Sequence, residues 1–398
     1  MREPKAAREN PLKTLEGLGQ SIWIDFIQRR MILSGELQRL IDEDGVSGVT
    51  SNPTIFEKAI DQSQDYDNAI HLLGLEGKNA TEMYETLAID DIQHVADILR
   101  PLYETSDGAD GFVSLEVSPH LAHDTPGTIA EARRLWNHVA RPNAMIKVPA
   151  TDEGIPAIGH LIGEGINVNI TLLFGLARYR QVTEAYLAGL EEAVTKHLPL
   201  RKISSVASFF LSRIDVLVDP LLSKHPGTAK SDEHAALALQ GRTALSCARL
   251  AYRMYRDVFG GERFRRFAAR GARTQRLLWA STSTKNPEYP DVKYVEPLIG
   301  PGTINTLPLE TLRAYRDHGR PRATLSENVP EAREVLEQLT RFGYDLETIS
   351  RRLEEEGTRR FDESFDLLLS TIARKSDRQS EVHPAAATVK PARMHNSG

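Results

Sequence analysis

The chain lacks the features that would assign it to a membrane, a disulfide-stabilised scaffold or a thiolate metal site. Cys247 is the only cysteine among 398 residues. One cysteine cannot form an internal disulfide or a thiolate zinc site, and it favours a reducing compartment. No apolar run reaches the roughly 20 residues that span a bilayer, and the first residues, MREPKAARENPLK, have no apolar signal core. We therefore expect a cytoplasmic protein with no membrane partner.

An excess of one charge sign is missing as well. The net charge is −6, and both signs are spread along the chain, so nucleic acid is not an expected partner. The most basic stretch, residues 263–276, could bind nucleic acid, but a solvated helix face is the better interpretation. Hydrophobic residues make up 40% of the chain, which suits a globular protein with a large core.

Short β-rich runs alternate with longer helical stretches. Most runs are nearly continuous in apolar or β-branched residues, which is typical of strands buried on both faces of a parallel sheet. Eight such strands favour a (β/α)8 TIM barrel of the α/β class with additional helices. An open doubly wound sheet is the alternative, but its glycine-rich dinucleotide fingerprint is missing. The predicted strands are 21–25, 48–51, 111–118, 144–148, 167–174, 204–210, 276–282 and 293–300.

The remaining segments look like additions to one barrel domain. Residues 1–20 form a polar N-terminal lead-in, and the barrel domain is expected to cover residues 21–375. A helical insertion is predicted at about 223–275, between the sixth and seventh strands, and C-terminal helices at about 305–374. The tail 376–398 is rich in Pro, Ala, Ser and charged residues and is predicted to be disordered.

Lys147 is the residue that proposes a chemistry. It lies within the apolar run AMIKVPAT, with Ile146 and Val148 beside it. Burial disfavours the charged form of an amine, and a neutral amine attacks ketones and aldehydes to form a Schiff base. Lys147 could instead extend its amine to solvent or pair with a carboxylate.

Other polar residues follow the predicted strands at the same end of the barrel. In a TIM barrel the carboxyl ends of the strands form the active-site rim, and buried polar groups cost free energy unless they are paired. The large number of polar residues expected at this one rim favours an active site over an ordinary hydrophobic core. The candidates, in chain order, are Asp25, Asn52, Glu116, Lys147, Asn169, Thr171, Ser208, Arg213, Ser283 and Lys285.

These groups could divide the work of Schiff-base chemistry. Glu116 could shuttle protons, Thr171 could hold a water, and Asp25 could take a proton from a substrate hydroxyl. Arg213 and Lys285 follow late strands, where phosphate groups are often bound.

Each residue also has a structural alternative. Asp25 or Asn52 could cap the following helix, and Glu116 could be an ion-pair partner of Lys147. Asn169 and Thr171 could tie strand ends together, and Arg213 and Lys285 could be surface charges.

Four segments resemble the transaldolase family. GVTSNPTIF (48–56) resembles its first signature, and MIKVPATDEGI (145–155) resembles the second, which surrounds the Schiff-base lysine. SLEVSP (114–119) and INVNITLLF (166–174) are similar to two further family segments. The resemblance runs in family order and spans roughly residues 21–285.

The resemblance implies a (β/α)8 barrel that transfers a dihydroxyacetone unit in the non-oxidative pentose phosphate pathway. The implied donors are sedoheptulose 7-phosphate and fructose 6-phosphate, and the acceptors are glyceraldehyde 3-phosphate and erythrose 4-phosphate. The residue roles that it implies are these: Lys147 forms the Schiff base, Asp25 is the base at the C4 hydroxyl, Glu116 and Thr171 hold the catalytic water, Asn52, Asn169 and Ser208 contact substrate, and Arg213 binds phosphate.

One position departs from a branch of the family. That branch has Ser-Phe-Arg-Asn where this chain has Ser283-Thr284-Lys285-Asn286, and lysine lacks the planar fork of arginine. Schiff-base chemistry needs no cofactor and no metal, and the spacing of His120 and His123 fits capping better than metal binding. The oligomeric state, monomer or homodimer, stays open.

Three rival functions also stay open. They are an aldolase that releases its three-carbon product, a catalytically silent barrel, and a pyridoxal-phosphate enzyme.

Overall fold

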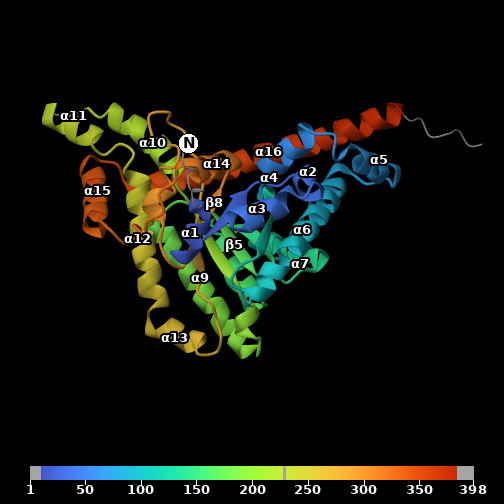
Figure 1. Cartoon of the computed structure of the whole chain (residues 1–398), viewed down its shortest axis with the longest axis horizontal. Coiled ribbons are helices and arrows are strands. Elements are labelled where there is room, and N and C mark those ends of the chain that lie inside the picture. Colours follow the sequence, from blue (N-terminus) through green and yellow to red (C-terminus); the bar gives the residue numbers. More distant parts are fainter. Residues whose placement is uncertain (1–9, 227–229, 383–398) are drawn as a thin grey trace, which may run out of the picture.

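A closed barrel of eight parallel strands forms the centre of the computed structural model, which describes residues 10–226 and 230–382 (Figure 1). Each strand pairs with its neighbours in chain order, and β8 closes the barrel against β1. The predicted TIM-barrel fold is therefore confirmed. The strands are β1 (Gln20–Asp25), β2 (Val46–Thr50), β3 (Phe112–Glu116), β4 (Ala144–Pro149), β5 (Val168–Leu173), β6 (Ser205–Phe210), β7 (Arg276–Ala280) and β8 (Thr303–Leu307).

The predicted position of the eighth strand is wrong. Residues 293–300 form turns and the 3₁₀ helix Glu296–Leu298, and β8 lies further on, at TINTL (303–307). Pro297 has no N–H to donate to a central strand ladder, whereas β8 pairs with β1 over residues 303–307 and with β7 over residues 303–305. The C-terminal helices accordingly begin after residue 307 and not at about 305.

Helices cover the outside of the barrel, and several begin at the signals expected from the sequence. Asn79 and Glu82 form a capping box at the start of α6, and Asp124 caps α7 with Pro126 in its first turn. Within the lead-in 1–20, α1 (Pro11–Gly17) precedes β1. The helices from β1 to β6 are α2 (Arg29–Leu33), α3 (Glu36–Asp44), α4 (Pro53–Asp61), α5 (Asp67–Leu75), α6 (Ala80–Thr105), α7 (Thr125–Val139), α8 (Gly154–Gly163) and α9 (Leu176–Thr195).

Seven further helices follow β6 and β8. The basic stretch 263–276 covers most of α13 and the first residue of β7, and its Arg263 pairs with Glu184 and Glu191. The helices are α10 (Ser212–Ser223), α11 (Lys230–Leu237), α12 (Thr243–Phe259), α13 (Glu262–Ala268), α14 (Leu309–His318), α15 (Val329–Arg341) and α16 (Leu346–Val382). In the described part of the segment 223–275 there are three whole helices, α11 to α13.

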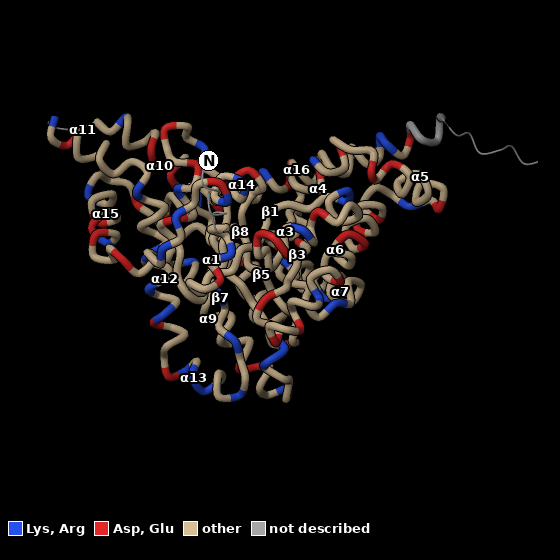
Figure 2. The backbone as a smooth tube through the Cα atoms, in the orientation of Figure 1, with Lys and Arg blue, Asp and Glu red and all other residues tan. Residues whose placement is uncertain are grey.

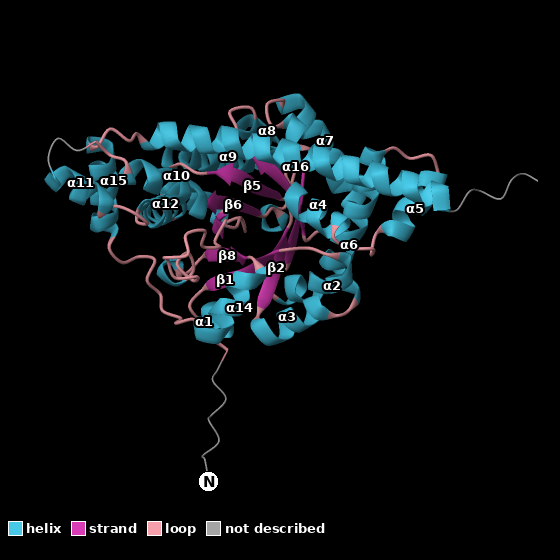
Figure 3. Ribbon diagram, turned by 90° about the horizontal axis from the view of Figure 1, so that it is seen from above, coloured by secondary structure: helices cyan, strands magenta, loops and turns pink. Residues whose placement is uncertain are grey.

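The last helix, α16, lies across the carboxyl ends of the strands (Figures 1 and 3). It contacts α4, α5, α6, β5 and the 3₁₀ turn Pro119–Leu121 that follows β3. Buried side chains such as Phe361, Phe365 and Leu368 fix it to the barrel. The helix continues past residue 376, where the disordered tail was predicted to begin, and residues 383–398 of that tail lie outside the described residues.

Charged residues of both signs are distributed over all parts of the fold (Figure 2). Among the described helices, none combines the length and the apolar character needed to cross a membrane.

Candidate active site

A cavity of about 690 Å³ opens at the carboxyl ends of the strands, beneath α16. It brings together seven of the ten residues predicted from the sequence. These are Asp25, Asn52, Lys147, Ser208, Arg213, Ser283 and Lys285. Glu116, Asn169 and Thr171 lie in the buried wall beside it and do not line it themselves.

Lys147 is held inside the barrel by two contacts. It sits on β4 opposite Glu116 of β3, and the strand pairing aligns the two residues directly. Its Nζ lies 3.2 Å from Glu116 Oε2 and donates a 3.0 Å hydrogen bond to the carbonyl oxygen of Ser51. The two paired side chains are only 4% and 5% exposed. The amine is therefore buried, oriented and next to a proton acceptor, as a Schiff-base lysine must be.

Asp25 ends β1 on the other side of the cavity. Thr50 Oγ1 donates to its Oδ1 over 2.7 Å and lies 2.8 Å from the hydroxyl of Thr306 on β8. Gln28 occupies the N-cap position of the next helix, α2, so Asp25 does not cap that helix. The capping alternative is therefore excluded for Asp25, which presents its carboxylate to the cavity.

Both carboxylates are biased toward the protonated form. Burial raises the pKa of Glu116 and outweighs the positive charge and hydrogen bond of Lys147. Burial likewise raises the pKa of Asp25, against the opposing effects of Lys147 and Thr50. Each group can thus hold or release a proton at pH values where an ordinary carboxylate stays ionised.

Asn169 ties three strands together below the cavity. Its Nδ2 donates to Ser114 Oγ over 2.9 Å, and its Oδ1 accepts from Ser208 Oγ over 2.7 Å. Asn169 is fully buried, and Lys147 is its partner in the β4–β5 pairing. The structure therefore places Asn169 as a support for Ser208 and the strand ends, and only Ser208 reaches the cavity.

Thr171 lies beside an irregularity of β5. The β5–β6 register shifts between Ile170 and Leu173, and Leu172 has a φ of 55°. Such bulges often occur next to active sites, where they redirect a side chain. Among the described residues, the buried Thr171 hydroxyl has no hydrogen-bond partner. A buried hydroxyl without a partner is costly, and it has the chemistry to hold a water molecule.

Asn52 has a structural role in addition to its place at the cavity. Its Oδ1 accepts a 3.0 Å hydrogen bond from the backbone N–H of Ile55 and so caps α4, while Pro53 occupies the first helical position. The capping interpretation of Asn52 is confirmed, and the same residue lines the cavity.

Positive charge lies at the outer part of the cavity. Arg213 of α10 is half-buried, and its guanidinium lies 5.9 Å from the ring centre of Phe210. Lys285 follows β7, and its Nζ donates a 2.5 Å hydrogen bond to Ser283 Oγ. Both cations line the cavity, and Lys285 is in addition exposed to solvent.

Several cavity residues were not among the predicted site residues, including Thr50, Thr306, Arg360 and Phe361. Thr50 lies inside the segment GVTSNPTIF, so its place after a strand was a usable signal. Thr306 was missed because it lies in the misplaced eighth strand. Arg360 and Phe361 come from α16, and no local pattern marks them; Phe361 lies with its ring centre 6.0 Å from Lys147 Nζ.

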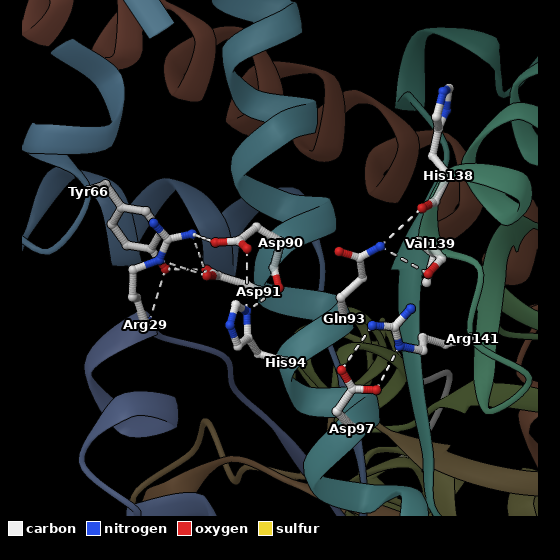
Figure 4. A network of polar contacts seen from close by, with 10 residues as sticks. All are labelled: Arg29, Tyr66, Asp90, Asp91, Gln93, His94, Asp97, His138, Val139 and Arg141. Atoms are coloured by element: carbon white, nitrogen blue, oxygen red, sulfur yellow. Dashed lines mark hydrogen bonds and ion pairs between the residues drawn. The ribbon is translucent and has the colours of Figure 1, made fainter. Parts of the chain in front are cut away.

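The loop after Asp25 is anchored by an ion-pair network (Figure 4). Arg29 opens α2 and donates to Asp90 over 2.7 Å and to Asp91 over 2.8 Å. Its guanidinium lies 4.8 Å from the ring centre of Tyr66, whose hydroxyl donates to Asp91 over 2.7 Å. Because residues 26 and 28 line the cavity, this network fixes the cavity wall next to Asp25.

No group of three or more His, Cys, Asp or Glu side chains could hold a metal ion within the described ranges. His120 instead contacts Asp362 and Asp366 of α16, and His123 contacts Glu153. The histidine pair thus belongs to the attachment of α16 and to the surface.

A family model described as Transaldolase/Fructose-6-phosphate aldolase matches residues 22–372. The chain belongs to the transaldolase family. It is 48% identical over 363 residues to a transaldolase of Thiobacillus denitrificans, which covers 91% of this chain and 99% of the relative. It is 47% identical over 367 residues to a transaldolase of Thermobifida fusca, covering 92% and 98% of the two chains.

A third transaldolase, from Mycolicibacterium smegmatis, is 45% identical over 371 residues, covering 93% of this chain and 98% of the relative. Nearly full coverage on both sides means that these transaldolases match the barrel together with the additional helices, not the barrel alone.

Proposed function

We propose that this enzyme of the transaldolase family transfers a dihydroxyacetone unit between sugar phosphates through a Schiff base on Lys147. The observation that carries the proposal is the buried amine at 3.2 Å from Glu116, beside a cavity with a second carboxylate, Asp25. The donors are sedoheptulose 7-phosphate or fructose 6-phosphate. The acceptors are glyceraldehyde 3-phosphate or erythrose 4-phosphate. The single cysteine supports a cytoplasmic location.

Imine formation begins when the neutral amine of Lys147 attacks the C2 carbonyl of the ketose. The carbinolamine then takes up a proton on its hydroxyl and loses water, which leaves a protonated imine. Glu116 is the nearest carboxyl group and can supply this proton, because its raised pKa allows it to hold one. Thr171, whose hydroxyl has no partner among the described residues, would hold the released water near Glu116.

Carbon–carbon cleavage follows at C3–C4. Asp25 takes the proton of the C4 hydroxyl, the C3–C4 bond breaks, and its electron pair moves into the protonated imine to form an enamine. The aldose phosphate leaves as an aldehyde. The enamine then attacks the acceptor aldehyde, Asp25 returns the proton to the new hydroxyl, and water hydrolyses the imine to free Lys147.

The enamine must be protected from stray protonation until the acceptor arrives. Phe361 and the buried strand residues around Lys147 provide an apolar cover. This cover favours transfer over release of the three-carbon product, which would be the reaction of the aldolase alternative. Arg213, Ser283 and Lys285 at the outer end of the cavity would bind the substrate phosphate.

Borohydride trapping tests the proposal. The enzyme is incubated with fructose 6-phosphate and reduced, and the modified peptide is identified by mass spectrometry. We expect a dihydroxyacetone adduct on Lys147 and its loss in Lys147→Ala. Lys58, an exposed lysine that lines the same cavity, provides the matched control, since Lys58→Ala should still be labelled at Lys147.

An adduct on Lys58, or none while transfer continues, would contradict the mechanism. Turnover that depends on an acceptor aldehyde separates transaldolase from aldolase activity. Turnover without an acceptor would favour the aldolase.

A further inference from the structure

Besides Lys147 and Lys58, three cationic side chains from distant parts of the chain line the substrate cavity. Arg213 comes from α10, Lys285 from the loop after β7, and Arg360 from α16. Burial is the main cause that lowers the pKa of the Arg213 guanidinium, and the positive charge of Arg360 lowers it further. The two arginines are therefore close enough for their charges to repel; the negative charges of Glu356 and Asp25 act in the opposite direction, and the pKa of Arg213 still lies below its ordinary value.

Among the described residues, none of these three cations has a carboxylate oxygen closer than 3.9 Å. Within the described residues, Arg213 has no hydrogen bond and no ion pair, and Lys285 bonds only to the neutral Ser283. Arg360 lies 3.9 Å from Glu356, at the outer limit of an ion pair. Other arginines of α16 pair more closely, as Arg352 does with Glu356 at 3.0 Å. Within the described residues, Arg213 and Lys285 thus have no direct ion-pair partner, and carboxylates such as Glu356 and Asp25 act on Arg213 only through their nearby charge.

Helix α16 holds Arg360 at a fixed place over the cavity. On one side of it Glu354 pairs with Arg178 of α9 at 3.1 Å, and on the other side Ser364 accepts a 2.8 Å hydrogen bond from Thr54 of α4. The next residue, Phe361, packs over Lys147. Because both neighbouring turns are attached to the barrel, Arg360 reaches the cavity without a movement of the helix.

We propose that Arg360 is a phosphate-binding residue of this enzyme, acting with Arg213 and Lys285 on the phosphate of the sugar substrates. The planar guanidinium of Arg360 supplies the two-pronged contact that Lys285 cannot make. The C-terminal helix therefore contributes both to phosphate recognition, through Arg360, and to the cover of the reactive lysine, through Phe361. The identity of the anion as a sugar phosphate rests on the proposed function.

The test compares Arg360→Ala with Arg359→Ala. Arg359 is the neighbouring exposed arginine on α16, and it pairs with Glu363 rather than lining the cavity. Binding of inorganic phosphate is measured by calorimetry, and kcat/KM is measured for fructose 6-phosphate and for fructose. Loss of one charged hydrogen bond corresponds to a roughly 10-fold change.

We expect Arg360→Ala to bind phosphate about 10-fold more weakly. Its preference for fructose 6-phosphate over fructose should fall by a similar factor, Arg360→Lys should recover part of the loss, and Arg359→Ala should match the wild type. Equal phosphate affinity of Arg360→Ala and Arg359→Ala would overturn the assignment. Phosphate binding needs no turnover, so a failure of the transfer reaction would be seen separately, in the wild-type enzyme.

Discussion

Replacing Lys147 with methionine removes one half of a buried ion pair while keeping a side chain of similar length. Glu116 then loses the contact at 3.2 Å and remains 5% exposed inside the barrel. Removing one partner of such a pair typically costs about 3–5 kcal/mol, because the remaining charge is buried without compensation. Since Glu116 can also take up a proton, we expect the lower end, about 3 kcal/mol at pH 8.

The loss of stability should depend on pH in a defined direction. The pKa of Glu116 in the folded protein is raised by burial, so the folded state binds more protons than the unfolded state above the ordinary glutamate pKa of about 4.3. The stability that Glu116 contributes therefore falls as the pH rises from about 4.3 through the raised pKa of Glu116 in the folded protein. The charge of Lys147 opposes this rise, so removing Lys147 raises the pKa of Glu116 further. More of the Glu116 carboxyl is then protonated at pH 5 than at pH 8, so the variant should lose less stability at pH 5 than at pH 8.

Urea unfolding of the wild type and the variant at both pH values measures this difference. The control is the double variant Lys147→Met/Glu116→Leu, which replaces the pair with two apolar side chains and should recover most of the stability. All of these variants lose transfer activity, so stability is the informative measurement. The reasoning is refuted if Lys147→Met is as stable as the wild type at pH 8, or if its loss is the same at both pH values.

Three further predictions use the same structure. Asp25→Asn should lower kcat by roughly 10²–10⁴-fold while borohydride still traps the uncleaved donor on Lys147; normal kcat would remove Asp25 from the cleavage step. Arg29→Met should cost about 3 kcal/mol because it leaves the buried Asp91 without its ion-pair partner, with only the hydrogen bond from Tyr66 remaining. Arg141→Met, at an exposed pair in Figure 4, should cost no more than about 1 kcal/mol; equal unfolding midpoints of the two would contradict this. Lys285→Ala should raise the KM for fructose 6-phosphate, and an unchanged KM would exclude Lys285 from the phosphate site.

Strand prediction succeeded where burial and sequence pattern agree. AMIKV and NVNITLLF are almost continuous apolar or β-branched runs, and both lie in strands of the barrel. TINTL failed because it is short and half polar. The buried hydroxyl of Thr306 forms its hydrogen bond with Thr50 of β2, across the place where β8 closes the barrel against β1. A pattern within one segment cannot report a partner that is 256 residues away.

The candidate site also contains residues that could be predicted from the sequence and residues that could not. Lys147, Glu116 and Asp25 could be predicted because each ends or interrupts an apolar strand, and parallel strands carry their ends to one rim. The supporting role of Asn169 could not be predicted, because the choice between a substrate contact and a strand tie depends on where Ser114 and Ser208 lie.

The sequence by itself determined seven of the eight strands, the candidate lysine Lys147 and the family resemblance, because periodicity and chemistry-bearing residues are local properties of the chain. Tertiary structure alone decided what covers Lys147. Helix α16 lies about 200 residues after Lys147 in the chain, and its placement follows from the packing of its apolar face on α4, α5 and β5. That packing brings Arg360 and Phe361 to the cavity, and nothing in their neighbouring sequence encodes it.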